Sequence, residues 1–132
     1  MTAETTKADF RTPDYLEHML EACDRVLQYT TGMTITEFLA NTLVQDAVLR
    51  NIEILGEATK NLLECAPEYT AVHPEIPWID IYGMRNRIAH GYFFINFEMV
   101  WSVVSVRIPS LRSEIADLLK SEPGFSLLRE DS

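Results

Sequence analysis

An apolar stripe at helical spacing over residues 43–65 constrains the fold of this chain more than any other feature. Its members recur every three or four residues for about six turns, and the opposite side of the same stretch is charged. The stripe consists of Val44, Ala47, Val48, Asn51, Leu55, Ala58 and Leu62. The charged side consists of Arg50, Glu53, Glu57, Lys60 and Glu64. A helix of this kind has to bury one side against other elements, and Pro67 ends it.

The residues before this stretch predict two further helices. Helical spacing of apolar residues indicates a first helix over about 13–30, which Gly32 stops. Thr34 and Glu37 form a capping box that begins a short helix ending by Asn41. Residues 1–11 are polar and show no period, so we expect a loose N-terminal arm there.

The residues after Pro67 predict a loop and two helices. Residues 66–77 contain three prolines and are typical of a loop. A helix is expected from Trp78 to a stop at Gly91, and after a turn Asn96 caps a last helix. Pro109 should kink or interrupt that last helix.

No stretch keeps the alternation of a strand, so the sequence predicts an all-α fold. We expect an up-and-down bundle of four to five helices. The 132 residues form one domain by length, with residues 123–132 as a frayed tail.

Composition excludes several classes of protein. No apolar run is long enough to span a membrane, and the N-terminus lacks the basic and apolar parts of a signal peptide, so we expect a cytoplasmic protein. Cys23 and Cys65 lack metal-site spacing and are expected to be reduced thiols, with a bridge between them as the alternative. Twenty acidic and eleven basic residues give a net charge of -9, which argues against a protein that coats nucleic acid.

One segment, residues 84–92, concentrates reactive side chains. It holds two guanidiniums, an amide, an imidazole and a phenol. On a helix Asn86 and His90 would share a face, whereas Arg85 and His90 would lie about 140° apart. Because the helix should end at Gly91 and arginine is long, Arg85 and His90 could still converge on one ligand.

These side chains suit the cleavage of a phosphodiester without a metal. Arginine offers a fixed charge and a fork that matches phosphate, and histidine exchanges a proton near neutral pH. In RNA the 2′-hydroxyl would be the nucleophile, and Asn86 would orient His90 or bind the substrate. His18 and His73 are isolated in the sequence and are expected to be structural or exposed.

The spacing of Arg85, His90 and Tyr92 resembles the Rx4HxY signature of the HepT-like branch of the HEPN superfamily. The resemblance extends over about residues 12–112. Its blocks are residues 14–20, 45–51, 54–60, 76–78, 83–92 and 100–101.

This resemblance implies a HEPN-type homodimer that acts as a metal-independent ribonuclease toxin. Arg85 would bind the phosphate and His90 would be the general acid and base, with Asn86 and Glu57 in supporting roles. It also implies a type VII-like toxin–antitoxin module, in which an MntA-type nucleotidyltransferase antitoxin uses ATP to AMPylate Tyr92 and silence the RNase. No metal or other cofactor is expected.

Each of these assignments has an alternative. Arg85 could pair with an acid on the long helix, His90 could cap a helix end, and Tyr92 could be a buried aromatic residue. Glu57 and Lys60 could form an ordinary ion pair on a solvated face. For the whole chain, the alternative function is a non-catalytic nucleotide- or partner-binding helper subunit of a nucleotidyltransferase.

Charge is distributed unevenly along the chain. Residues 85–112 contain four arginines and one glutamate, a local net charge of +3. The arginines are Arg85, Arg87, Arg107 and Arg112. A dimer that joins two such segments would form a basic slot for a flexible RNA strand, and binding there should weaken as salt rises.

Overall fold

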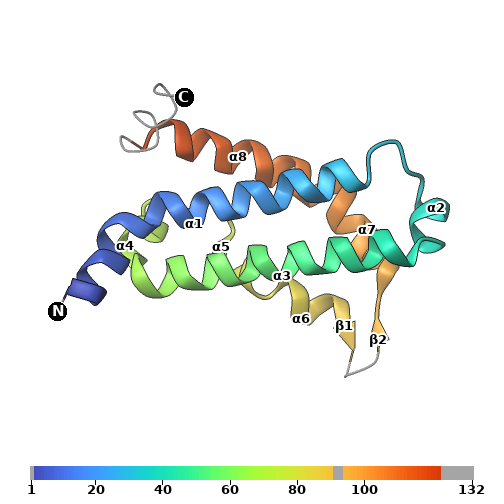
Figure 1. Ribbon diagram of the computed structural model, residues 1–132, viewed down its shortest axis with the longest axis horizontal. Helices are drawn as coiled ribbons and strands as arrows, with labels where there is room; N and C mark the ends of the chain where they lie inside the picture. Colours follow the sequence, from blue (N-terminus) through green and yellow to red (C-terminus); the bar gives the residue numbers. More distant parts are fainter. Residues whose placement is uncertain (1, 91–93, 123–132) are drawn as a thin grey trace.

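A computed structural model describes residues 2–90 and 94–122, and this part of the chain consists of helices, the loops and turns between them and one short hairpin. Two long helices, α1 (Thr2–Tyr29) and α3 (Thr42–Cys65), form the body together with the C-terminal helix α8 (Ile108–Lys120). Helix α1 packs along both α3 and α8 (Figure 1). The predicted all-α bundle is confirmed.

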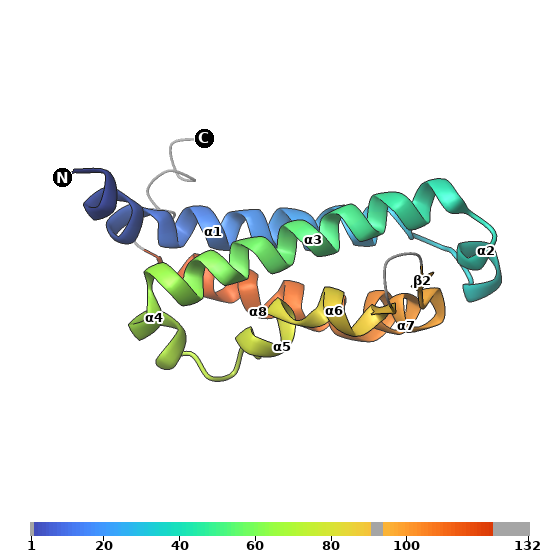
Figure 2. The same cartoon turned by 90° about the horizontal axis from the view of Figure 1, so that it is seen from below.

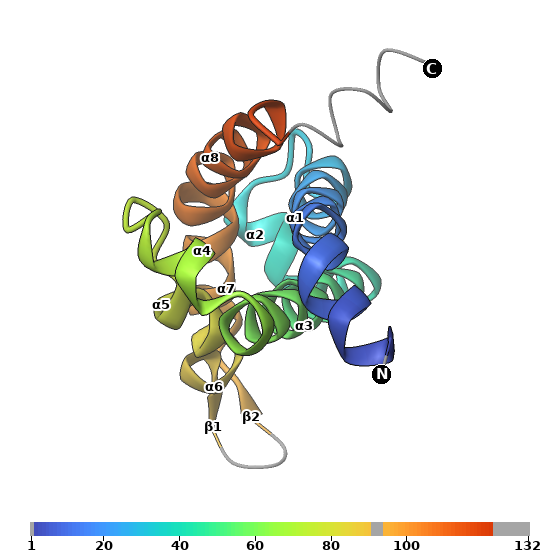
Figure 3. The same cartoon turned by 90° about the vertical axis from the view of Figure 1, so that its left-hand side faces the viewer.

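Shorter elements complete the bundle and carry the candidate site. They are α2 (Ile35–Leu39), α4 (Pro67–Ala71), α5 (Trp78–Tyr82), α6 (Met84–Ile88), β1 (Ala89–His90), β2 (Phe94–Ile95), α7 (Phe97–Ser102) and the π-helical turn η1 (Val103–Arg107). Helices α4, α5 and α6 follow one another along α3 (Figure 2). Viewed along the bundle, the β1–β2 hairpin projects away from the helices (Figure 3).

The apolar stripes predicted from the sequence meet in one core. Helices α1, α3 and α8 bury Leu16, Met19, Cys23, Val26, Val48, Leu55, Leu62, Ile108, Leu111, Ile115 and Leu119. A fully buried aliphatic side chain stabilises the fold by about 1.5–3 kcal/mol. The predicted charged side of α3 faces outward, which places Glu53 and Glu57 where they can line a site.

Local capping signals set the helix ends as expected. The Thr34–Glu37 capping box is present, and Gly32 has the positive φ of 74° that favours glycine after a helix. Asn96 caps α7 through a bond from the Met99 N–H. Asn41, expected at the end of the short helix, is the N-cap of α3.

The structure differs from the prediction at the N-terminus. Helix α1 begins at Thr2 and runs through the residues assigned to a loose arm, with Pro13 in its interior. Alanine, glutamate and lysine in this segment favour helix, and they outweigh the backbone bond that proline removes. The predicted frayed tail, residues 123–132, lies outside the described residues.

The expected loop over residues 66–77 contains a helix. Pro67 occupies the first turn of α4, where its missing N–H costs nothing. The indole N–H of Trp78 donates to the carbonyls of Thr70 and His73, at 3.1 and 3.0 Å. This contact joins α4 to α5. Trp78 is the first residue of the α5–α6 segment, which carries the site.

The helix predicted from Trp78 to Gly91 is wrong in extent. It divides at Gly83 into α5 and α6, and α6 ends at Ile88. The backbone then becomes extended, and the N–H of Asn96 donates to the Ile88 carbonyl at 2.8 Å. Hairpin pairing therefore replaces helix, and the expectation of a chain without strands is corrected by these two short strands.

Pro109 interrupts the last helix as predicted, through a widened turn. The chain stays helical from Phe97 to Lys120, but η1 has π geometry, with the Ile108 N–H donating to the Val103 carbonyl. In a regular α-helix the proline ring would clash with the carbonyl four residues earlier. The wider turn separates the two groups.

Candidate active site

Helix α6 presents Arg85, Asn86 and Arg87 because its two apolar residues anchor it. Met84 and Ile88 are buried against the core. They lie one turn apart, so the three polar residues between them are exposed. Helices α5 and α6 both pack on α3, which brings this short polar run beside the charged side of the long helix.

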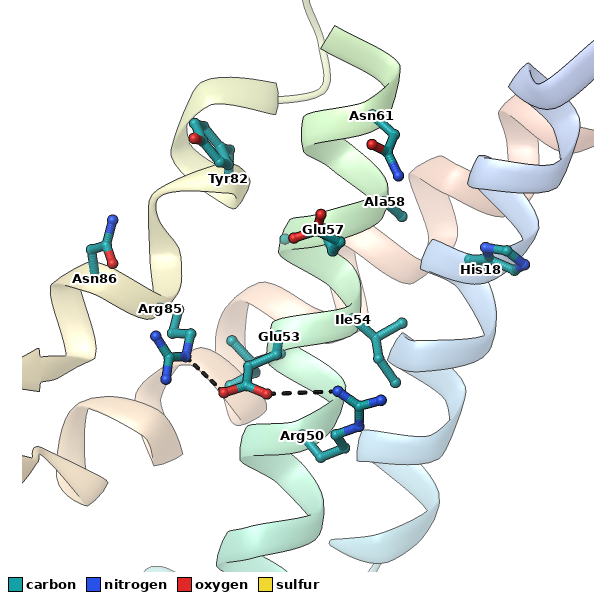
Figure 4. A pocket seen from close by; sticks show the side chains of 12 residues that line it. His18, Arg50, Glu53, Ile54, Glu57, Ala58, Asn61, Tyr82, Arg85 and Asn86 are labelled. Carbon is teal, nitrogen blue, oxygen red and sulfur yellow. Dashed lines mark hydrogen bonds and ion pairs between the residues drawn. The ribbon is translucent and has the colours of Figure 1, made fainter. Parts of the chain in front are cut away.

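Arg85 forms an ion pair with Glu53 of α3. Its Nε donates to Glu53 Oε2 at 2.8 Å. Arg50 Nη1 lies 3.8 Å from Glu53 Oε1, so one carboxylate lies between two guanidiniums (Figure 4). Among residues 12–89 and 94–122, no acceptor contacts the two terminal nitrogens of Arg85.

A groove of about 500 Å³ runs over α3 between α1 and the α5–α6 segment. Arg85, Asn86 and Glu57 all line it, as Figure 4 shows. The structure therefore brings three of the predicted site residues together. Glu57 is exposed, and the acid that pairs with Arg85 is Glu53, one turn earlier on α3.

Sequence reasoning did not assign Glu53 or His18 to the site, although both line this groove. Glu53 was one of several charges on a solvated face, and only the packing of α6 on α3 identifies it as the partner of Arg85. His18 is exposed on α1 and lines the groove on the far side of α3 from Arg85 (Figure 4). No local spacing in the sequence relates either residue to the motif.

The backbone of His90 lies in β1, paired with Phe94 of β2. Since α6 ends two residues earlier, the helical geometry expected for Asn86 and His90 does not hold. The side chain of His90 and the whole of Tyr92 lie outside the described residues. Phe94 is 72% exposed on the projecting hairpin.

Each of the four arginines in the segment predicted to be basic contacts an acid of the same chain. Arg87 and Arg107 both contact Asp80, Arg112 contacts Asp24 at 2.8 Å, and Arg85 contacts Glu53. The hydrogen bond from Arg107, reinforced by both positive charges, holds the pKa of Asp80 below its usual value. Likewise, the hydrogen bond and charge of Asp24 raise the pKa of Arg112.

Both cysteines are free thiols, so the alternative of a bridge is excluded. Burial raises the pKa of Cys23 to about 12, which keeps its thiol protonated. In the part of the chain that the structure describes, no group of three His, Cys, Asp or Glu residues is arranged to hold a metal ion. No helix there is long and apolar enough to cross a membrane.

Comparison with known proteins identifies relatives over most of the chain. The family described as "Ribonuclease HepT-like" matches residues 19–118. A "Putative RNase" of Caldanaerobacter subterraneus subsp. tengcongensis is 34% identical over 108 residues, which cover 82% of this chain and 94% of that protein. A "Probable ribonuclease HepT" of Thermococcus cleftensis is 36% identical over 107 residues, which cover 81% of this chain and 94% of that protein. No solved structure gives a significant match.

Proposed function

The chain belongs to the family of HepT-like ribonucleases, and from this premise we propose that it is an RNA endonuclease. Arg85 would bind the scissile phosphate, and His90 would transfer protons. The position of Arg85 carries the proposal, because it lies at the groove with its Nε held by Glu53 and its terminal nitrogens facing no acceptor among the described residues. Those nitrogens form the fork that matches two phosphate oxygens.

The proposed reaction needs only RNA and groups of the protein. The 2′-oxygen of the ribose attacks phosphorus while the bond from phosphorus to the 5′-oxygen breaks. One histidine takes the 2′-hydroxyl proton and another donates a proton to the departing 5′-oxygen. The products are a 2′,3′-cyclic phosphate and a 5′-hydroxyl, and Arg85 stabilises the negative charge on the phosphoryl oxygens.

The motif supplies one histidine per chain, so we propose that the second comes from the motif of a partner copy and that the enzyme is a homodimer. Exposed apolar side chains beside α6 support this. Met99 and Val106 are both exposed there and line a hollow of about 220 Å³ together with Arg87. Burial of such side chains is a usual source of dimer stability.

We further propose that the enzyme is the toxin of a type VII-like toxin–antitoxin module. An MntA-type nucleotidyltransferase antitoxin would transfer AMP from ATP to Tyr92. The phenol oxygen would bond to the α-phosphorus, and pyrophosphate would leave. The place of Tyr92 in the sequence, two residues after His90, supports this role because the added phosphate would repel the RNA phosphate.

One observation favours the alternative function. The groove volume of about 500 Å³ falls within the range of small-ligand sites, so the chain could hold a nucleotide as a helper subunit. In that case Arg85 would grip a nucleotide phosphate without cleaving RNA. Tight ATP binding by this chain alone, without RNase activity, would establish this alternative.

The proposed function is tested with purified, unmodified protein and a labelled single-stranded RNA, with and without EDTA. Wild type should cleave in both conditions, and Arg85→Ala and His90→Ala should lose at least about 100-fold in rate. Arg25→Ala and His73→Ala serve as controls, since both residues lie outside the groove and should leave cleavage unchanged. Cleavage by His90→Ala at the wild-type rate would refute the proposal.

The regulatory part is tested separately by intact mass after co-expression with the neighbouring nucleotidyltransferase gene. Wild type should gain mass in steps of one AMP unit, and Tyr92→Phe should gain none. Adducts of the same mass on Tyr92→Phe would exclude Tyr92 as the modified residue.

A further inference from the structure

Glu53 is the residue that fixes the direction of Arg85. It comes from α3, 32 positions earlier in the chain, and reaches the guanidinium across the contact between α3 and α6. Its two carboxylate oxygens face different arginines, Oε2 toward Arg85 and Oε1 toward Arg50. Figure 4 shows the three side chains in a row along one edge of the groove.

The atom that makes the bond to Glu53 decides which edge of the guanidinium remains for a ligand. A guanidinium can present the edge formed by Nε and one terminal nitrogen, or the edge formed by its two terminal nitrogens. Glu53 takes Nε at 2.8 Å, so the two terminal nitrogens remain for phosphate. A free arginine side chain would sample many rotamers, and this bond removes part of that freedom before RNA binds.

Arg50 offsets the electrostatic repulsion that a carboxylate beside a phosphate site would cause. Glu53 alone would cancel the charge of Arg85 and repel an anionic ligand. With Arg50 at 3.8 Å from its other oxygen, the three side chains together carry a net charge of +1. The row therefore remains attractive to phosphate while Arg85 is held in place.

We infer that Glu53 is a positioning residue of the ribonuclease, which orients Arg85 toward the scissile phosphate; this inference rests on the proposed function. Two other roles predict different results. If Glu53 were a latch that competes with phosphate, its removal would increase the affinity for RNA. If Glu53 only joined α3 to α6, its removal would lower stability and leave the kinetic constants of the folded protein unchanged.

The experiment compares Glu53→Ala, Glu53→Gln and the control Glu64→Ala, which removes an exposed acid near the C-terminal end of the same helix. Steady-state cleavage of labelled RNA gives kcat and KM, and circular dichroism gives the folded fraction. We expect Glu53→Ala to lower kcat about tenfold or more with little change in KM, because misplacement of a catalytic group by an ångström has effects of this size. Glu53→Gln should restore most of kcat, since its amide oxygen still accepts from Nε, and Glu64→Ala should match wild type.

The outcomes separate this inference from the proposed function. A wild-type kcat for Glu53→Ala, or a fall in KM for both Glu53 variants, would overturn the positioning role while RNA cleavage by wild type stands. No cleavage by wild type would instead overturn the proposed function. The NMR signal of the Arg85 Nε–H reports the geometry without any activity: it should be sharp and protected in wild type and in Glu53→Gln, and lost in Glu53→Ala.

Discussion

Asp80 is predicted to hold α6, and therefore Arg85, in register with the rest of the fold. It is the one acid of α5 and contacts Arg87 of α6 at 2.8 Å and Arg107 of the π-helical turn η1. One side chain thus connects α5, α6 and η1, and α6 carries Arg85. Asp80→Ala removes both ion pairs at once.

The loss of stability expected for Asp80→Ala follows from the exposure of Asp80, Arg87 and Arg107. They are 35%, 47% and 42% exposed, so solvent screens each pair and each contributes no more than about 1 kcal/mol. Because two pairs share one carboxylate, Asp80→Ala should lower the free energy of unfolding by about 1–2 kcal/mol. For 132 residues the typical unfolding entropy converts this into a fall in Tm of roughly 4–7 °C.

The same ion pairs predict that the stabilisation by Asp80 depends on pH. The folded pKa of Asp80 is lowered, first by the hydrogen bond from Arg107, so the stabilisation is complete above the unfolded pKa and is lost as pH falls through the folded pKa. The difference in stability between wild type and Asp80→Ala should be constant from about pH 7 to 5 and should shrink below about pH 4.

Urea denaturation followed by circular dichroism measures both effects. The control is Asp24→Ala, which removes one ion pair of comparable exposure, that with Arg112. A double-mutant cycle of Asp80→Ala with Arg107→Ala isolates the coupling of that pair. The reasoning is refuted if Asp80→Ala costs no more stability than Asp24→Ala, or if the difference from wild type grows as the solution is acidified.

Two further predictions concern the core. Leu55→Ala should lower the free energy of unfolding by about 2–5 kcal/mol, measured by urea denaturation, because Leu55 is buried between α3 and its neighbours and leaves a cavity; a loss below about 1 kcal/mol would contradict the buried position. At pH 8 a thiol reagent should label Cys65 at least about tenfold faster than Cys23, whose thiol is buried and has its pKa raised to about 12. Mass spectrometry of the digested protein after timed labelling measures this, and equal rates would contradict it.

The sequence predicted the helices well wherever the cause of the helix is local. The apolar stripe of residues 43–65 becomes α3, one residue longer at its start, because burial of that stripe decides both the helix and its orientation. The capping box at Thr34 and the N-cap at Asn96 are likewise made by residues three positions apart. Such signals can be read without knowing what the helix packs against.

The end of α6 could not be read in this way. Gly91 was a plausible helix stop, yet the helix ends at Ile88 because the Ile88 carbonyl accepts from Asn96, eight residues later. The same contact establishes the hairpin that carries the backbone of His90. An extended chain advances about 3.3 Å per residue, compared with 1.5 Å in a helix. The backbone of His90 therefore lies further in space from that of Arg85 than a continuous helix would place it.

The charge at the site could not be predicted from neighbouring residues in the sequence either. Counting along residues 85–112 gives a basic segment, but three of its four arginines pair with acids that lie 32, 27 and 88 positions away along the chain. Only Arg87 pairs with an acid close to it in the sequence, Asp80. Formal charge is a property of sequence, whereas the field at a site depends on which acids the fold places beside each base. We therefore expect RNA affinity to depend on the local row of Arg50, Glu53 and Arg85 more than on the net charge of the segment.

The ion pair of Arg85 bears on the two interpretations of this residue, a surface salt bridge and a phosphate-binding role. A surface salt bridge with an acid on the long helix stood as the alternative to a phosphate-binding role. The observed bond uses only Nε, and the terminal nitrogens face no acceptor among the described residues. The salt bridge is therefore compatible with the proposed phosphate binding, since it would orient the group that we propose binds phosphate. An arginine bound to Glu53 through both terminal nitrogens would have left phosphate only the edge that includes Nε, so the atom that makes the bond decides which edge of the guanidinium remains for a ligand.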